Sequence, residues 1–281
     1  ASKVIFIKKN LIEIQLNGEI IESFQCEDPL GYIDDLQKSF ELKQNEDLPI
    51  FNGGLVGYFG YDCVRFIEHK LANSEPPDQI GTPDALFMIS DEVAVFDNHK
   101  NKLHLIVLVE SEEDIEKANI RLDELEGKLK ESLPFEEFKK PIKSIEESDF
   151  VSGFGEEEFK LSVEKAKEYI ESGDIMQVVC SQRMSIPFNA DPVALYRSVR
   201  QLNPSPYMYY LNLDEFHIVG SSPEILARLE DGKITVRPIA GTRRRGKDEE
   251  DDKAMEEDMV NDPKEIAEHL MLIDLGRNDV G

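Results

Sequence analysis

One stretch of the sequence restricts the fold more than any other, the run of strand-forming residues from Tyr207 to Pro238. It reads YMYYLNL, EFHIVGSS, ILARLEDG and KITVRP, and its Asp231-Gly232 pair is a hairpin signal. Strands joined by such short turns pair antiparallel, because a parallel pair needs a crossover of a dozen or more residues. A Rossmann-type parallel sheet is excluded, since it requires regular alternation of strands and helices.

The rest of the chain predicts both strands and helices, and hence an α+β fold. Asn17-Gly18 marks a hairpin within residues 11–24, and residues 85–110 predict two strands joined by an Asp-Asn-His-Lys-Asn turn. Residues 175–188 also have a strand-like composition. Helices are predicted near residues 29–42, 111–133, 156–172, 190–203 and 262–275.

Two segments of the chain have clear boundary signals. A polar, charged stretch from Pro134 to Ser152 predicts a division into domains over residues 1–140 and 150–281. The last helix is predicted to start with Asp262 as N-cap, Pro263 as first residue and Glu265 as the partner in a capping box.

The charge of the chain limits its partners. With 58 acidic and 32 basic residues the formal net charge is −26. Such a field repels phosphate backbones and anionic lipid headgroups, so we expect no nucleic acid and no membrane surface as partner. An anionic ligand needs a local exception to this field.

Other features predict a cytoplasmic protein. The opening ASKVIFIKKN has no long apolar stretch followed by a cleavage site, and no segment has the length of a membrane span. Cys26, Cys63 and Cys180 are far apart, without a CxxC pair or a neighbouring histidine. We predict buried, reduced thiols.

The densest positive cluster, RPIAGTRRRG at Arg237 to Gly246, is the local exception that an anion requires. Glycine lets a ligand approach the backbone, and amides with a hydroxyl can bind a carboxylate. Gly241 and Thr242 are therefore predicted to face a small carboxylate, with the arginines lowering the electrostatic cost. The acidic block from Asp248 to Asp252 is predicted to be a solvated loop.

Three glutamates each allow two interpretations. Glu224 follows a strand in GSSPE, where partial desolvation would raise its pKa and suit it to donate a proton, although spacing alone favours an exposed turn residue. Glu265 and Glu268 share a helix face and could hold Mg²⁺, although spacing alone favours a capping role for Glu265 and solvation for Glu268. His269, beside them, is predicted to be structural.

The glycines of Asn52 to Gly60 (NGGLVGYFG) fit neither a dinucleotide fingerprint nor a Walker loop. They are predicted to let a second layer approach a strand closely.

Six motifs in order, GGLVGYFGYD, ESGDIMQVVCSQR, LNPSPYMYYL, GSSPE, PIAGTRRRG and KEIAEHLMLIDLGRND, resemble those of the chorismate-utilising enzymes, most closely the large component of anthranilate synthase. The resemblance implies large, mainly antiparallel sheets packed face to face with helices outside. Residues 1–140 would be part of the N-terminal domain of that component, and residues 150–281 the first part of its chorismate-binding domain.

The resemblance also implies roles for individual residues. Gln177 stands where water-adding relatives carry a basic lysine, and Ala240 stands where aminodeoxychorismate synthases usually carry a nucleophilic lysine. Direct attack by ammonia is thereby implied, with Ala240, Gly241 and Thr242 binding the substrate. Pro206 and Met208 match positions of the tryptophan feedback pocket.

The implied reaction converts chorismate and ammonia to anthranilate and pyruvate. Mg²⁺, held in part by Glu265 and Glu268, would anchor the ring carboxylate, and Glu224 would protonate the departing C4 hydroxyl. The implied partner is a glutamine amidotransferase subunit in a hetero-oligomer, and the implied inhibitor is tryptophan.

Two parts of the family pattern are not found in this sequence: an N-terminal segment and the C-terminal part of the chorismate-binding domain. We therefore expect the chain alone to be inactive and to expose apolar surface. The alternatives are an aminodeoxychorismate synthase component and a noncatalytic module that binds a carboxylate or tryptophan.

Overall fold

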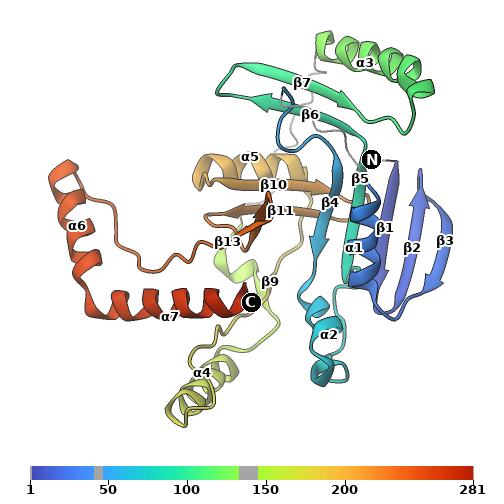
Figure 1. Ribbon diagram of the computed structural model, residues 1–281. Coiled ribbons are helices and arrows are strands. Elements are labelled where there is room, and N and C mark those ends of the chain that lie inside the picture. The colour runs from blue at the N-terminus through green and yellow to red at the C-terminus, as the bar shows by residue number, and fades with distance from the viewer. Residues whose placement is uncertain (1, 41–46, 133–144, 281) are drawn as a thin grey trace. The chain divides into compact units, whose positions relative to one another are not determined.

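The computed structural model describes residues 2–40, 47–132 and 145–280. The chain forms two compact units, residues 1–135 and 136–281, and the boundary stretch expected from the sequence begins at this division. Figure 1 shows both units, and each is described here by itself. Within the described residues no helix combines the length and apolar character needed to cross a bilayer.

The first unit is built on a five-stranded antiparallel sheet. Its strands lie in the order β3-β2-β1-β5-β4. Asn17 and Gly18 have φ angles of 52° and 84°, as a two-residue turn between β2 and β3 requires, so the predicted hairpin is confirmed. The strands are β1 (Lys3–Lys8), β2 (Leu11–Leu16), β3 (Glu19–Gln25), β4 (Gly54–Phe59) and β5 (Ala85–Ser90).

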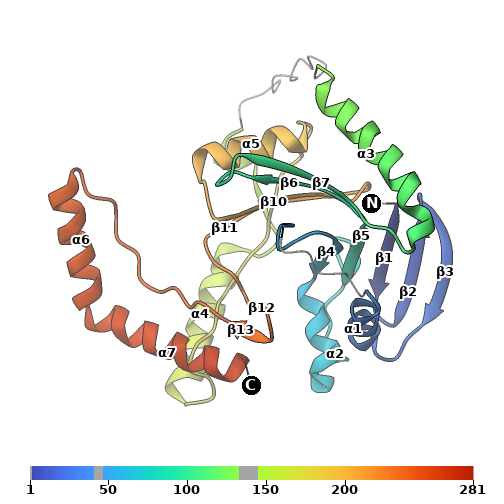
Figure 2. The ribbon, with the colours of Figure 1, turned by 45° about the horizontal axis from the view of Figure 1, so that its top comes forward.

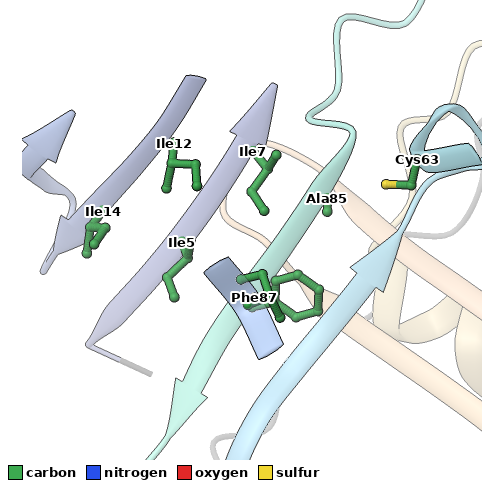
Figure 3. Close-up of a cluster of buried hydrophobic side chains, with 8 residues drawn as sticks. Ile5, Ile7, Ile12, Ile14, Cys63, Ala85 and Phe87 are labelled. Carbon is green, nitrogen blue, oxygen red and sulfur yellow. The ribbon is translucent and has the colours of Figure 1, made fainter. Parts of the chain in front are cut away.

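One face of this sheet carries the core. Side chains two residues apart point to the same face of a strand, and Figure 3 shows the result for β1, β2 and β5. Helix α1 (Pro29–Ser39) covers this face with Ile33, and its N-cap Asp28 accepts from the Gly31 amide. The buried cluster consists of Ile5, Ile7, Ile12, Ile14, Ile33, Cys63, Ala85 and Phe87.

Cys63 is the one fully buried thiol of the three, and burial raises the pKa of this thiol to about 11. Cys26 and Cys180 are only partly buried, and all three are free. The prediction of reduced thiols is confirmed, whereas full burial applies to Cys63 alone. The short helices η1 (Tyr61–Cys63), α2 (Val64–Ile67) and η2 (His69–Leu71) follow β4.

A separate hairpin completes the first unit. Residues 85–110 form three strands and not the two expected, because the chain leaves the large sheet at Asp91. Strand β6 (Glu92–Asp97) pairs with β7 (Lys102–Val107), and helix α3 (Ile115–Lys130) follows the short helix η3 (Glu112–Asp114) and packs on β7. Arg121 of α3 donates to Glu92 at 2.7 Å and 3.0 Å.

Gly57 in β4 has the structural role predicted for it, although the close neighbour differs from the expectation. A Cβ at Gly57 would lie 1.8 Å from the Leu86 carbonyl oxygen and 2.9 Å from the Phe87 Cα. The neighbour is thus the adjacent strand β5 of the same sheet, and not a second layer.

Gly57→Ala is therefore expected to destabilise the chain by about 2 to 3 kcal/mol, because the β5 backbone must shift to admit the methyl group. Gly127→Ala is the matched control: nothing lies within 4 Å of a Cβ there, and Gly127 is inside α3. This change should stabilise by up to about 1 kcal/mol. Urea unfolding followed by circular dichroism measures both, and equal effects would contradict the close approach at Gly57.

The second unit contains four helices and three pairs of short strands among its described residues (Figures 1 and 2). Helix α5 packs on the hairpin β10–β11. The helices are α4 (Glu156–Glu171), α5 (Pro192–Leu202), α6 (Glu249–Asn261) and α7 (Pro263–Asp279), with the single turn η4 (Glu147–Asp149). The pairs are β8 (Val151–Ser152) with β9 (Met184–Ser185), β10 (Tyr207–Asn212) with β11 (His217–Ser222), and β12 (Arg228–Glu230) with β13 (Lys233–Thr235).

The expected strand over residues 175–188 is wrong for most of its length, because only Met184 and Ser185 pair. A strand forms only where a neighbouring backbone accepts its hydrogen bonds. Asp231 and Gly232, by contrast, have φ angles of 49° and 73°, so the predicted hairpin between β12 and β13 is confirmed.

The acidic block is not the solvated loop that the sequence suggested. Asp248 is the N-cap of α6 and accepts from the Asp251 amide, and the following four acids form the first helical turn. Carboxylates are stabilised at a helix N-terminus by the helix dipole and by its free amides.

The described residues of the second unit leave most of their large apolar side chains exposed. Among the described residues of the second unit only Leu213 is a buried apolar residue, and Leu226 is 96% exposed. The expected exposure of apolar surface is confirmed.

The overall pattern of antiparallel strands and helices confirms the α+β class.

Candidate functional site

The segment from Val236 to Gly241 lies along helix α7. Val236 Cγ2 is 3.3 Å from the place of a Cβ on Gly276, and a Cβ on Gly241 would lie 3.2 Å from Glu265 Oε2. Five extended residues and eleven helical residues both span about 17 Å, so the segment follows the helix in the opposite direction. Figures 1 and 2 show the extended chain beside α7.

Gly241 occupies the point where this segment meets Glu265. Its φ of 84° is a conformation that side chains rarely adopt, and Met259 Cγ would be 3.3 Å from a Cβ. The predicted substrate loop and the predicted metal ligand Glu265 are thus brought together. Ala240 is half-buried and Thr242 is exposed.

Arg243 joins this loop to the corner between α6 and α7. Its Nε donates to Asp258 Oδ2 at 2.7 Å, its Nη2 to Asp262 Oδ2 at 2.7 Å, and its Nη1 to Glu265 Oε1 at 3.0 Å. The side chains of Arg243 and Glu265 are 24% and 18% exposed. One guanidinium therefore contacts three carboxylates from three places in the chain.

These contacts affect the ionisation of the cluster. Hydrogen bonds to Asp258, then to Glu265 and Asp262, raise the pKa of Arg243 above its ordinary value. The pKa of Asp262 is lowered, chiefly by the backbone amide of Lys264 and further by Arg243. The contacts thus favour the charged forms of Arg243 and Asp262.

The reciprocal half of the predicted capping box is not formed. Asp262 caps α7 by accepting from the Lys264 amide, and Pro263 is the first residue, as predicted. The Asp262 amide donates to the Met259 carbonyl, however, and Glu265 turns to Arg243.

The other arginines of the cluster are also paired, in contrast to the expected positive island. Arg244 donates to Asp251 at 2.9 Å, and Arg245 donates to Asp252 at 3.0 Å. The acids that follow the loop neutralise it, because the first turn of α6 folds back on the arginines. Within the described residues Arg237 makes no ion pair, so it is the cation of the cluster that can still meet an anion.

A second group of predicted residues gathers at the open end of the hairpin β10–β11. Met208 lies opposite Ser221, and the Ser205 hydroxyl donates to the Ser222 carbonyl. Ser221 Oγ donates to the Asn203 carbonyl at 2.8 Å, and Ser222 Oγ to the Glu224 carbonyl at 2.9 Å. These bonds connect the turn that holds Pro206 to the backbone of Glu224.

Glu224 itself is exposed, as the simpler of its two interpretations, an exposed turn residue, has it. Pro206 is exposed and Met208 is half-buried. Gln177 is exposed in the irregular segment before β9. No hydrogen bond between described residues joins the hairpin group, the α7 group and Gln177.

The α7 group contains residues that the sequence interpretation missed. Asp258 and Arg243 were not selected, although Asp258, Asp262 and Glu265 lie four and three residues apart in the sequence, across the corner between α6 and α7. That spacing is a usable signal for a shared cation. The serines that link the two ends of the hairpin gave no comparable signal.

Comparison with known proteins identifies the class. A family model described as chorismate binding enzyme matches residues 13–281, and the chain belongs to this family.

Within the family, the chain is 49% identical to anthranilate synthase component 1 of Pseudomonas aeruginosa over 281 residues, which cover 99% of the chain and 57% of that relative. It is 46% identical to the component 1 of Aquifex aeolicus, over 98% of the chain and 56% of the relative. The crystal structure of anthranilate synthase component I from Streptococcus pneumoniae matches with a TM-score of 0.79 and 32% identity, covering 99% of the chain and 59% of that structure. The chain thus has the fold of the matching part of that protein, and it spans little more than half the length of these relatives.

Proposed function

We propose that the protein acts as the large subunit of anthranilate synthase and converts chorismate and ammonia to anthranilate and pyruvate. The observation that supports this most directly is the approach of Gly241 to Glu265. This approach brings the loop at Gly241, which is suited to bind a substrate carboxylate, next to Glu265, which is suited to bind a cation. Chorismate carries two carboxylates, so binding it requires both hydrogen-bond donors and a compensating positive charge.

The residues present fit a magnesium site in chemical type. Mg²⁺ prefers carboxylate oxygens and is commonly held by one or two carboxylates, with water and substrate oxygens completing the shell. Glu265 and Glu268, both half-buried on α7, would supply these two carboxylates. The described residues contain no group of three or more such side chains arranged for a metal. When bound, the ion would neutralise substrate charge against a chain of net charge −26.

In the proposed reaction the loop orients the substrate and Glu224 moves the proton. The backbone around Gly241 and the hydroxyl of Thr242 would bind a carboxylate. The ammonia lone pair would form the bond to C2, and Glu224 would protonate the C4 hydroxyl as its C–O bond breaks. The ring then loses its proton at C2 while the bond from C3 to the enolpyruvyl oxygen breaks, and the departing enolpyruvate gains a proton at its methylene carbon to give pyruvate and the aromatic product.

Two residues favour direct attack by ammonia over the two other reactions of the family, water addition and attack through a lysine adduct. Gln177 cannot accept a proton at neutral pH, so a basic lysine for water addition is missing. Ala240 has no nucleophile, so no adduct forms with the enzyme at this position. Both features favour direct attack by ammonia.

We further propose a glutamine amidotransferase subunit as ammonia source and tryptophan as inhibitor. The chain supports the second proposal through the serine bonds that connect the turn of Pro206 to Glu224.

The proposed activity is tested on the whole protein encoded by its gene, supplied with chorismate, ammonium and Mg²⁺. Anthranilate fluorescence should rise, and tryptophan should suppress the rise. Formation of aminodeoxychorismate would support the alternative synthase. Binding of chorismate by calorimetry without any product would support the noncatalytic module.

A further inference from the structure

We infer that Arg243 is a positioning residue that competes with a divalent cation for Glu265. This inference rests on the metal role proposed for Glu265 and Glu268 and adds a residue to it. Arg243 would thereby couple cation binding to the position of the substrate loop.

Arg243 contacts the same carboxylate, that of Glu265, to which the proposed cation would bind. Glu265 Oε1 accepts from Arg243 Nη1 at 3.0 Å, while Oε2 faces Gly241. A cation at Oε2 therefore shares the carboxylate with a guanidinium. The two positive charges repel, and the side chain is only 18% exposed, so water screens this repulsion incompletely.

Arg243 can release Glu265 without leaving the corner. Its Nε and Nη2 remain bonded to Asp258 and Asp262, both at 2.7 Å. A planar guanidinium with several separate donors permits this partial release, whereas the single ammonium of lysine does not.

Release of Glu265 must affect the loop, because Arg243 is two residues after Gly241 and its Nη1 also donates to the Thr242 carbonyl at 3.2 Å. The Nη1 group is thus shared between the loop backbone and Glu265. If a cation weakens one contact, the other changes as well, and coupling of this kind is reciprocal. Substrate bound to the loop should in turn favour the cation.

The test is titration of the whole protein encoded by the gene with Mn²⁺, with free Mn²⁺ counted by electron paramagnetic resonance. Arg243→Gln should bind Mn²⁺ at least about fivefold more tightly than the unchanged protein, the effect expected for one like charge at contact distance even in bulk water. Arg244→Gln is the matched control. It removes the same charge one residue away, from a guanidinium that contacts Asp251 and not Glu265, and should change the affinity less than twofold.

An arginine with only a structural role would lower the unfolding temperature without raising the affinity. Equal or weaker Mn²⁺ binding by Arg243→Gln with helix content preserved would overturn the inference. If that variant loses helix content, Arg243→Met decides, because methionine keeps part of the aliphatic side chain and removes the charge. Binding tighter than that of the unchanged protein supports the inference, and equal or weaker binding overturns it.

Glu268→Gln separates failure of the inference from failure of the proposed metal site. This change removes a proposed ligand and leaves the contacts of Arg243 intact. If Mn²⁺ binding does not weaken, the metal site is wrong, and with it the inference. If it weakens but Arg243→Gln has no effect, the site is retained and only the inference fails.

Discussion

Glu224→Gln is expected to lower the turnover of chorismate to anthranilate about 100-fold or more in the whole protein. General acid catalysis contributes about 10² to 10⁴ in rate, and an amide of the same shape cannot release a proton to a leaving hydroxyl. The Michaelis constant for chorismate should change little, because the proton is transferred after the substrate binds. Steady-state anthranilate fluorescence with ammonium as donor measures both constants.

Glu215→Gln is the matched control for this change. Glu215 lies in the turn at the opposite end of the same hairpin, and it loses the same charge. Its turnover should stay within a factor of two of the unchanged protein. If Glu224→Gln kept more than a tenth of the turnover, another group would be the proton donor.

Ile7→Ala is expected to destabilise the first unit by about 2 to 5 kcal/mol. Ile7 is fully buried between Ile12 of β2 and Ala85 of β5 in the strand register. Removing buried methyl and methylene groups costs their transfer free energy and leaves a cavity. Hydrogen exchange of the β1 and β2 amides, read by mass spectrometry, reports the loss in this unit specifically.

Ile20→Ala in β3 removes the same atoms from a side chain that is 56% exposed. Its effect should stay within about 0.5 kcal/mol, as for most surface substitutions. A loss below about 1 kcal/mol for Ile7→Ala would contradict the assignment of the core to this face of the sheet.

The sequence predicted the features of the fold that depend on neighbouring residues. Asn17-Gly18 and Asp231-Gly232 form hairpins because their positive φ angles suit two-residue turns. Helix α5 begins at Pro192 after the N-cap Asp191, within residues 190–203 where the sequence predicted a helix. Such signals require no knowledge of distant contacts.

Features that depend on distant partners were harder to predict. The segment from Ile175 to Phe188 has strand composition, yet only two of its residues pair. The acids from Asp248 to Asp252 were predicted to form a loop, and their helical turn was missed. Asp251 and Asp252 pair with Arg244 and Arg245 only because the helix folds back on the arginines, which the sequence does not show.

Only part of the candidate site was predicted, because the rest depends on contacts between residues that are distant in the sequence. Gly241 and Glu265 were both selected from the sequence, and the structure brings them together. Their link through Arg243 was missed, since composition suggested free arginines. The roles of Glu224, Gln177, Pro206 and Met208 remain predictions.

The alignment of residues 236–241 along α7 limits which insertions and deletions evolution can accept here. One extended residue advances about as far as two helical residues, and two helical residues turn the helix by about 200°. A single inserted residue would therefore carry Gly241 past Glu265 toward the opposite side of α7. A substitution at Ala240 leaves this alignment unchanged, so the chemistry of the loop can diverge by point mutation while its length stays fixed.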